Sequence, residues 1–452
     1  MMTHEAVCTL FEGAGDFNTR MLRCGEFTLY AYFVDGLVSG SDISAYILKP
    51  ITEHLQAATL EELYSFALDG MIYNAVAQPC TELKDAASKL VNGFCVLLFP
   101  GVGALAYEVK TSEKRSISAP DLENTAKGAK DAFVETVRSN TSLLRRHLRT
   151  PDLRLKELAV GKYSQTNVSI AWIDGITDMD MVSRMILRLS GMKTDGILTP
   201  AAVEEAVTGS RFTAFPLLQY TQRTDRFCQG LLEGRVGLFV DGIPLGYLAP
   251  VDIGYLMDSM EDYSRDFLTA SAVRILRYLA LFVDLLLPAL YIAMTAYHFN
   301  LLPPSVAQVI LQGRQNVPFS PIWEILLLLL AFELLQESGV HLPKSIGQSV
   351  SIIGGIVVGT VGVEAGLISS IALITVSISG VCGFVLPNRD LADAIRLWRF
   401  LLAVGAAVFG LLGIVGAVAI LIIRLAFLKS LGKPYIKFFE PKLIRTRMDG
   451  EQ

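Results

Sequence analysis

The sequence predicts an α/β region of two similar modules followed by an α-helical polytopic membrane domain. Of the 452 residues, 52% are hydrophobic and only 18% are charged, and the apolar excess is concentrated after about residue 273. Residues 346–387, about 42 in number, contain a single charged side chain, whereas about 20 residues cross a bilayer core as one helix. The residues before 270 have the composition of soluble globular domains.

Two pairs of similar segments predict the duplicated module. FTLYAYFVDGLVSGSDISAYILKPI at 27–51 reads as a strand, a turn at Asp-Gly and a helix opened by Ser41 or Asp42, and NVSIAWIDGITDMDMVSRMILRLS at 167–190 repeats that order about 139 residues later. LVNGFCVLLFPGVGALAYEV at 90–109 and LLEGRVGLFVDGIPLGYLAP at 231–250 form a second pair, at an offset of about 141 residues. The nearly constant offset indicates one unit present twice.

A polar, basic segment separates the two copies. Its sequence LLRRHLRTPDLRLKEL is typical of a solvated helix and linker, but it could also be a docking surface for another subunit or for anionic headgroups. The candidate docking residues are Arg145, Arg146, Arg149 and Arg154. The expected parts are a first α/β module at 1–112, a basic helical linker at 113–160, a second module at 161–270, a transmembrane helical domain at 271–430 and a basic cytosolic tail at 431–452.

We expect five or six membrane spans. The first is expected at about 275–298, and the second is the apolar run that carries Glu324, Glu333 and Glu337. The third and fourth divide residues 346–387 near Val361–Gly366, and the basic sequence NRDLADAIRLWRF is then predicted to be a cytosolic loop. Residues 398–427 are long for one upright helix and short for two, which leaves the number of spans open.

Charged side chains within apolar segments are costly, and in membrane proteins they usually serve function. The alternative is that such a side chain pairs with a neighbouring helix for packing alone. For Asp284 we weigh the functional and the packing explanations equally. The candidates for an ion pathway are Asp284, Glu333, Glu337 and Glu364. The candidates for close helix packing or gating are Pro288, Gly354, Gly355, Gly359 and Gly362.

Several function classes are disfavoured. The net charge of −5 gives no reason to expect nucleic acid. GVGALA at 101–106 is followed by a strand-like segment instead of the helix that a nucleotide loop needs, and the sequence contains no G-x-x-x-x-G-K-[ST], G-x-S-x-G or H-E-x-x-H. The six cysteines form no CxxC pair, which indicates free thiols in a reducing compartment. We therefore expect no enzyme, cofactor or metal, and the N-terminus lacks a signal peptide, so the N-terminal half should be cytosolic.

The assembled segments resemble the GerA family, which comprises the A subunits of bacterial spore germinant receptors and their SpoVA-operon paralogues. The similar segments cover about residues 140–441 in order, with mild departures at VPFSPIWE, at His341 and at SLGKPY. They are RTPDLRLKELAVGKYSQTNVSIAWIDGI, LLEGRVGLFVDGIP, EDYSRDF, LPALYIAMTAYH, FELLQESGVHLPKSIGQSVSIIGGIVVG, VGVEAGLIS and SLGKPYIKFFEP.

The resemblance implies a multi-pass protein of the spore inner membrane that acts with germinant receptor B and C subunits. It further implies that A subunits associate into a homo-oligomeric ring in the lipid bilayer, and that this ring conducts monovalent cations when a nutrient triggers germination. A SpoVA-type paralogue that amplifies ion release, a secondary transporter and a non-conducting membrane scaffold remain alternatives.

Overall fold

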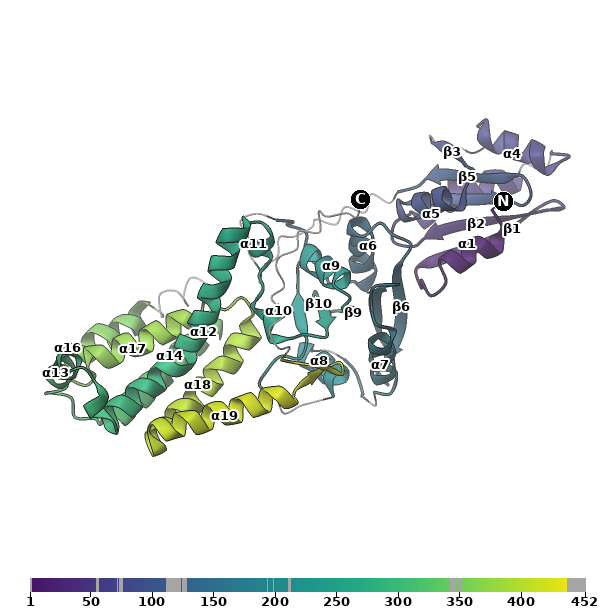
Figure 1. Cartoon of the computed structure of the whole chain (residues 1–452). Coiled ribbons are helices and arrows are strands. Elements are labelled where there is room, and N and C mark those ends of the chain that lie inside the picture. Colours follow the sequence, from purple (N-terminus) through teal and green to yellow (C-terminus); the bar gives the residue numbers. More distant parts are fainter. Residues whose placement is uncertain are drawn as a thin grey trace. The chain divides into compact units, whose positions relative to one another are not determined.

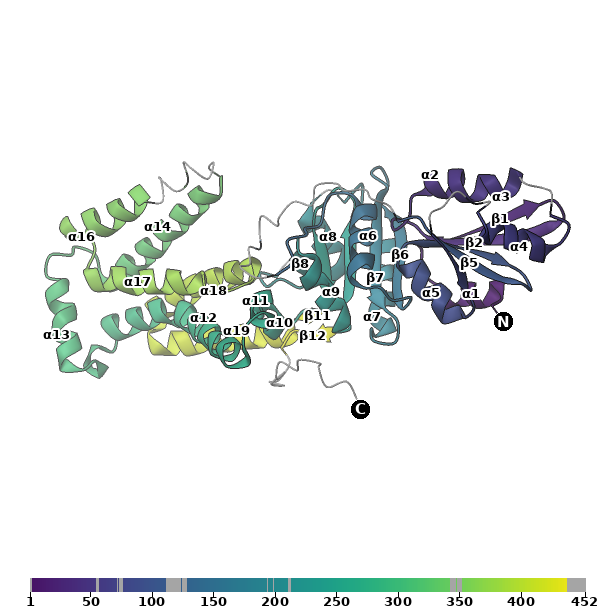
Figure 2. The same ribbon diagram turned by 90° about the horizontal axis from the view of Figure 1, so that it is seen from above.

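The computed structural model describes residues 2–53, 57–70, 72, 76–110, 123, 128–192, 194–197, 199–209, 213–341, 347 and 352–436. The chain divides into two compact units, which Figures 1 and 2 show in two orientations. The α/β unit comprises Met1–Arg211 and Leu217–Pro250, and the helical unit comprises Phe212–Pro216 and Val251–Gln452. The predicted change from an α/β region to a helical region is therefore confirmed.

The first sheet of the α/β unit is antiparallel, with strand order β1-β2-β4-β5-β3. The predicted strand-turn-helix segment forms β2 and the helix α2, but Ser39, whose hydroxyl accepts from the Asp42 N–H, is the helix cap in place of Ser41 or Asp42. The elements are α1 His4–Leu10, β1 Phe17–Cys24, β2 Phe27–Val34, α2 Gly40–Asp42, η1 Ile43–Leu48, α3 Lys49–Glu53, α4 Leu60–Leu68, β3 Ala77–Cys80, α5 Leu83–Val91, β4 Phe94–Phe99 and β5 Gly103–Glu108.

The second sheet has the corresponding order β6-β7-β9-β10-β8 and is also antiparallel. Helices α6 and α9 pack against β7 and β9 (Figure 2). Phe133, Phe227 and Phe239 form its aromatic core, and Gly237 and Gly246 are required there because a Cβ would lie 2.3 Å and 2.6 Å from the Phe227 ring. The elements are α6 Val137–His147, β6 Leu153–Val160, β7 Thr166–Ile173, α7 Met179–Ser190, α8 Pro200–Thr208, β8 Gln219–Thr221, α9 Thr224–Leu232, β9 Val236–Val240 and β10 Gly246–Ala249. The shared order is what two copies of one module would give.

The prediction of a helical linker at 113–160 is wrong at its C-terminal end. Leu153–Val160 forms β6, which pairs along its length with β7. Leu153 and Leu155 are buried on either side of Arg154, as in a strand. Lys156 and Glu157 are then both exposed, so the alternation is interrupted before Val160 is buried again. Residues 111–122 and 124–127 lie outside the described residues.

A buried ion pair joins the two halves of the α/β unit. The Arg145 guanidinium on α6 donates to both carboxylate oxygens of Asp16, which precedes β1, at 2.7 Å and 2.8 Å, and to the Thr150 carbonyl at 3.1 Å. Their side chains are 1% and 3% exposed. Arg145 is therefore an internal residue, and its prediction as a docking residue is wrong.

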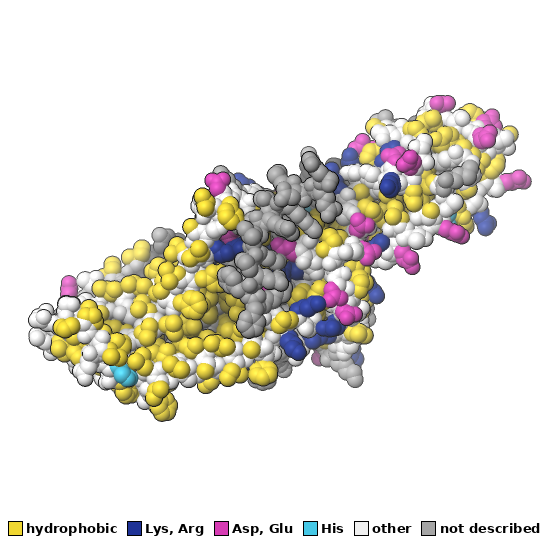
Figure 3. Space-filling model, in the orientation of Figure 1, with side chains coloured by type: hydrophobic (Ala, Val, Ile, Leu, Met, Phe, Trp, Pro, Cys, Tyr) yellow, Lys and Arg dark blue, Asp and Glu magenta, His cyan; other side chains and the backbone are white. Residues whose placement is uncertain are grey.

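The helical unit is organised around the long helix α12, which packs against α14, α17, α18 and α19. Apolar side chains cover much of its face in Figure 3. Its elements are α10 Ile253–Met257, α11 Met260–Tyr263, α12 Phe267–Ala296, η2 Phe299–Leu301, α13 Pro304–Gly313, α14 Pro321–His341, η3 Val357–Val361, α16 Gly362–Glu364, α17 Ser370–Gly383, α18 Arg389–Phe409, α19 Leu411–Phe427, β11 Lys429–Ser430 and β12 Lys433–Pro434.

In the described part of the chain, α12 alone is long and apolar enough to cross a membrane by composition. Shorter apolar helices cover Ile352–Glu364, Ser370–Gly383 and Leu411–Phe427. The stretch at 398–427 is divided by Gly410, whose φ of 62° ends α18 and begins α19. The five or six spans remain a prediction.

The predicted cytosolic loop at 388–400 is instead the beginning of α18. Asn388 caps this helix by accepting a hydrogen bond from the Leu391 N–H at 2.8 Å. Leu391, Ile395, Arg399 and Leu402 lie on its buried face at spacings of three and four residues. The segment is therefore an amphipathic helix, which its basic residues made resemble a membrane-flanking loop.

We predict that Arg145→Ala lowers the midpoint of thermal unfolding of the α/β unit, because removing one partner of a buried ion pair costs about 3–5 kcal/mol. Arg146→Ala, which changes the exposed neighbouring arginine, should change stability by less than about 0.5 kcal/mol. Proteolysis of the full chain during heating measures both. Equal midpoints for the two variants would contradict the structural role of Arg145.

Two buried thiols should resist alkylation. Burial raises the pKa of the Cys95 thiol to about 12, and it raises the pKa of Cys228 to about 12. Since the thiolate is the nucleophile, we expect maleimide at pH 8 to modify the half-buried Cys8 before either of them. Mass spectrometry of the folded protein measures the order, and unfolding should make all three equally reactive. Early modification of Cys95 would be inconsistent with this core.

Candidate functional site

Asp284 lies in the middle of α12 and is completely buried. Its Oδ1 atom accepts a hydrogen bond from Arg399 on α18 at 2.7 Å and contacts the Ser379 hydroxyl on α17 at 2.9 Å. The same hydroxyl lies 3.0 Å from the Asp284 carbonyl oxygen. Pro288, four residues later, has no N–H to bond that carbonyl within the helix. Ser379 therefore fills the hydrogen-bonding position that the proline leaves open.

Arg399 also binds Glu333 on α14. Its second terminal nitrogen donates to Glu333 Oε1 at 2.8 Å, and Arg396, one turn earlier on α18, approaches Glu333 Oε2 at 3.3 Å. We call Asp284, Glu333, Ser379, Arg396 and Arg399 the Arg399 cluster. The four helices that supply it, α12, α14, α17 and α18, pack against one another (Figure 1).

The exposure of the two carboxylates differs. The Asp284 and Arg399 side chains are 0% and 2% exposed, whereas Glu333 is 37% exposed. Burying a charge is costly unless a partner compensates it, so Asp284 and Arg399 depend on each other. Glu333 could exchange its partner for water at lower cost. The pair of Asp284 and Arg399 is therefore closed to water, while the contact between Arg399 and Glu333 lies at the partly exposed side of the cluster.

One polar atom of the cluster lacks a partner. Among the described residues, Asp284 Oδ2 has no hydrogen-bond partner and is buried. It faces Gly383 of α17, where a Cβ would lie 3.1 Å from this oxygen. Gly383 is therefore a position where a side chain would press on the carboxylate.

The structure brings together two of the four predicted ion-pathway residues. Asp284 and Glu333 share Arg399, whereas Glu337 is exposed on α14 and Glu364 is exposed on α16. Of the predicted packing residues, Pro288 is buried beside the cluster. Their role in conduction remains a prediction.

The four predicted packing glycines differ in their surroundings. A Cβ on Gly354 would lie 2.1 Å from Leu335 Cδ2, so this glycine is in close contact with α14, and a larger residue would require the Leu335 side chain to move. Gly362 faces Ile368 closely, Gly359 has ordinary room, and Gly355 has nothing within 4 Å. Gly380, which the sequence analysis did not single out, packs against the Phe332 ring. A Cβ on Gly380 would lie 2.5 Å from the nearest atom of that ring.

A second buried carboxylate was missed as a site residue. Glu324 is 2% exposed, accepts from the Ser369 N–H at 2.6 Å and lies 3.0 Å from Arg314. It therefore holds the start of α17 and the end of α13 against α14. Arg314 was the signal, since it is the only basic residue between 299 and 319.

Buried charges also occur where the helical unit begins. Arg277 on α12 is 5% exposed and donates to both oxygens of Asp262 on α11, at 2.5 Å and 2.8 Å. Arg277 also donates to the Met257 carbonyl of α10 at 3.2 Å, so it fixes two short helices to α12.

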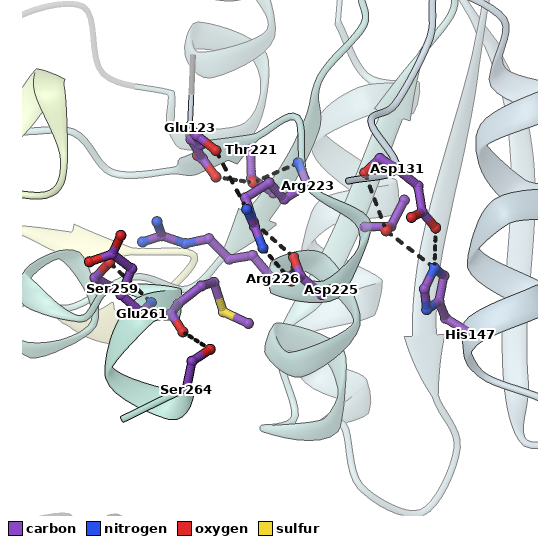
Figure 4. Close-up of polar contacts among 12 residues, drawn as sticks. Glu123, Asp131, His147, Thr221, Arg223, Asp225, Arg226, Ser259, Glu261 and Ser264 are labelled. Atoms are coloured by element: carbon purple, nitrogen blue, oxygen red, sulfur yellow. Dashed lines mark hydrogen bonds and ion pairs between the residues drawn. The ribbon is translucent and has the colours of Figure 1, made fainter. Parts of the chain in front are cut away.

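The contacts of His147 in the α/β unit differ from those of a catalytic triad (Figure 4). His147 Nε2 lies 2.8 Å from Asp131 and 3.3 Å from the Thr224 hydroxyl. A triad requires the carboxylate and the hydroxyl on opposite ring nitrogens, whereas here both contact the same one. Among the described residues, no group of three or more His, Cys, Asp and Glu side chains could hold a metal.

A second polar group in Figure 4 surrounds Glu123. Its carboxylate accepts from the Thr221 hydroxyl at 2.8 Å, and Arg223 pairs with Asp225 through two nitrogens at 3.0 Å and 2.5 Å. Burial raises the pKa of Glu123, and the nearby Arg226 opposes this most strongly. These contacts connect Glu123 to β8, through Thr221, and to α9, through Arg226.

The other predicted docking residues remain near the surface. Arg146 and Arg149 are exposed, while Arg154 on β6 pairs with Asp174 at 3.2 Å and donates to the Leu10 carbonyl at 3.1 Å. Of the four predicted docking residues, only Arg146 and Arg149 are therefore exposed enough to contact a partner or a headgroup.

We predict that Arg399→Gln destabilises the helical unit by about 3–5 kcal/mol, because it leaves Asp284 buried without its positive partner. The thermal midpoint of the protein in detergent should fall by about 10 °C. Arg389→Gln, at the exposed start of the same helix, is the matched control and should have little effect. Equal midpoints would mean that the pair is not important for stability.

The chain is similar to known germination proteins. The sequence profile of the family described as Bacillus/Clostridium GerA spore germination protein matches residues 5–449. In Bacillus subtilis (strain 168), the protein named "Uncharacterized membrane protein YfkQ" is 35% identical over 439 residues, which cover 97% of this chain and 85% of that protein. Spore germination protein A1 of the same strain is 33% identical over 420 residues, with coverage of 92% and 86%.

Spore germination protein B1 of that strain is 32% identical over 408 residues, with coverage of 89% and 83%. A solved structure, the N-terminal domain of the A subunit of the Bacillus megaterium spore germinant receptor GerK3, aligns at 26% identity with a TM-score of 0.42, covering 54% of this chain and 92% of that one. The profile match along nearly the whole chain, together with relatives above 30% identity over most of their length, shows that this chain belongs to the GerA family of spore germination proteins.

Proposed function

We propose that the chain is the A subunit of a germinant receptor and forms, with further copies, a nutrient-gated cation pathway in the spore inner membrane. Membership of the GerA family supports a role in germination. The observation that carries the conduction step is the Arg399 cluster, in which side chains from four helices of the helical unit meet at the buried pair of Asp284 and Arg399. Charges within apolar helices usually serve transport or gating.

In the described arrangement the cluster is closed. Arg399 neutralises Asp284 through one terminal nitrogen and donates to Glu333 through the other, so the arginine engages both carboxylates. Conduction requires Arg399 to leave Glu333, which the partial exposure of Glu333 makes the easier of the two separations. In a ring of subunits, one freed carboxylate per copy would raise the local cation concentration.

The proposed membrane topology uses α12 as the first span. The helix α14, the apolar helices at Ile352–Glu364 and Ser370–Gly383, and the pair α18 and α19 supply the other crossings. Five or six crossings result, depending on whether α18 and α19 each cross, with the N-terminal α/β unit in the cytosol. Glu337 and Glu364 would then face headgroups, water or a neighbouring copy.

The partners in this proposal are B and C subunits of the same receptor. The exposed Arg146 and Arg149 remain candidates for docking them or for anionic headgroups. No covalent chemistry is required of this chain.

A non-conducting scaffold is the second candidate function. It is favoured by one observation, namely that Asp284 and Arg399 compensate each other, as a purely structural pair would. In that case the cluster only fixes the helices, and the carboxylates have no role in ion flow.

Conductance measurements distinguish the two functions. We expect the purified protein with its B and C partners to give cation-selective current in planar bilayers when nutrient is present. Glu333→Gln should alter the current or its selectivity by several-fold, while Glu364→Gln tests the exposed carboxylate. Thermal midpoints equal to wild type must be shown for each variant.

Silence of verified oligomers with all partners present would favour the scaffold. The same conclusion would follow if current persisted unchanged in Asp284→Asn, Glu333→Gln, Glu337→Gln and Glu364→Gln together.

A further inference from the structure

The short segment Phe212–Pro216 belongs to the helical unit, although the chain on both sides belongs to the α/β unit. It follows α8 and directly precedes Leu217, Leu218 and strand β8, so only three residues separate Phe215 from the edge strand of the second sheet. Any displacement of β8 along the chain must therefore be accommodated within these residues.

Phe215 is held firmly in the helical unit. Its side chain is 3% exposed, and its ring stacks on Trp398 of α18 at 6.4 Å between centroids. The Tyr435 ring, which is completely buried, lies 6.2 Å away on another side. The Phe215 N–H donates to the Thr213 hydroxyl at 3.2 Å, which fixes the turn that presents the ring.

Trp398 immediately precedes Arg399. Successive residues of a helix point about 100° apart, so Trp398 faces Phe215 from one side of α18 while Arg399 reaches Asp284 and Glu333 from the next. A helix moves as a rigid element over such a short distance. A rotation of α18 that relieves one contact therefore changes the other.

The C-terminal hairpin completes the surroundings of Phe215. The Tyr435 carbonyl accepts from the Ile253 N–H at 3.2 Å, and the Ser430 hydroxyl accepts from the Val251 N–H at 3.0 Å. These are the first residues of the helical unit after Pro250. The chain passes between the two units after Pro216 and after Pro250, and the residues beside both passages contact the group formed by Phe215, Trp398 and Tyr435 or its hairpin.

We infer that Phe215 is a positioning residue through which the α/β unit controls the Arg399 cluster by way of Trp398. This inference rests on the proposed function, because it names the route by which the closed cluster is released. Pulling Phe215 away from Trp398 frees α18 to turn, and that turn separates Arg399 from the half-exposed Glu333 before it separates Arg399 from Asp284. The coupling needs a second arrangement of α18, so the test measures whether the two contacts respond together.

The coupling is testable by fluorescence without any current. The chain has three tryptophans, and Trp172→Phe with Trp323→Phe leaves Trp398 as the sole reporter. In this background we expect Phe215→Ala to increase acrylamide quenching of Trp398 at least twofold. Glu333→Gln should also increase it, because it weakens the Arg399 contact on the other side of α18, whereas Glu337→Gln one turn along α14 is the control and should not.

Each fluorescence result decides the inference. If Phe215→Ala leaves quenching unchanged, the aromatic contact does not exist in solution. If Phe215→Ala acts but Glu333→Gln does not, the contact exists and is not coupled to the cluster. If both act while no variant and no wild-type assembly conducts, the coupling stands and the proposed conduction fails.

Germination of spores measures the consequence. At equal receptor levels, Phe215→Ala should slow the nutrient response at least tenfold, Phe215→Tyr should retain it, and Phe215→Ala with Trp398→Ala should be no slower than the slower single variant. Tyr163→Ala, which removes a ring that is 75% exposed, is the control. Additive losses from the two substitutions, or a Phe215→Ala response equal to the control, would overturn the inference.

Discussion

The helical unit depends on one buried group, Asp284, and on what α12 cannot provide for it. Pro288 removes the backbone donor that would bond the Asp284 carbonyl, and the apolar surroundings remove the water that would solvate its carboxylate. Ser379 compensates the first loss and Arg399 the second. A helix that contains a proline and, one turn before it, a buried acid is stable only if α17 and α18 pack against it, so Ser379 and Arg399 define where three helices meet.

The second consequence concerns α18. Because Arg399 extends from Asp284 to Glu333, α18 also connects α14 to the centre of the unit, and Trp398 places the next position of the same helix against Phe215. The α/β unit has its own buried pair, Arg145 and Asp16, which fixes α6 to the start of the first sheet. In both units, ion pairs lie at the junctions between parts, while the apolar cores fill the parts themselves. Such pairs specify an arrangement more than they add stability.

Much of the α/β fold could be predicted from sequence, because its strands alternate or are fully apolar and its turns contain glycine. The strands β2, β4, β5, β7, β9 and β10 lie where the pattern predicted them. The strand β6 was missed since its charged residues Arg154, Lys156 and Glu157, two of them consecutive and exposed, made the segment look like a polar helix. The short edge strands β3 and β8 have three or four residues, too few for a periodic signal.

The residues of the Arg399 cluster could be predicted only in part, again because charged residues near one another were misinterpreted. Asp284 and Glu333 stand out in apolar segments, but their partner Arg399 was assigned to a loop, because arginines near one another resemble a membrane-flanking segment. Its spacing from Leu391, Ile395 and Leu402 would have placed it on the buried face of a helix. Which carboxylate it binds could not be predicted, since the crossing of α12, α14 and α18 depends on packing between distant residues.

The mutual dependence of Asp284 and Arg399 is the central claim, and a double-mutant cycle tests it most directly. The thermal midpoint of the protein in detergent would be measured for Asp284→Asn, for Arg399→Gln and for both together. Each single change leaves a buried charge unpaired, so the double variant, which carries neither charge, is predicted to recover at least half of the loss seen in Arg399→Gln. Losses that simply add in the double variant would contradict the account, because they would mean that the two groups act independently.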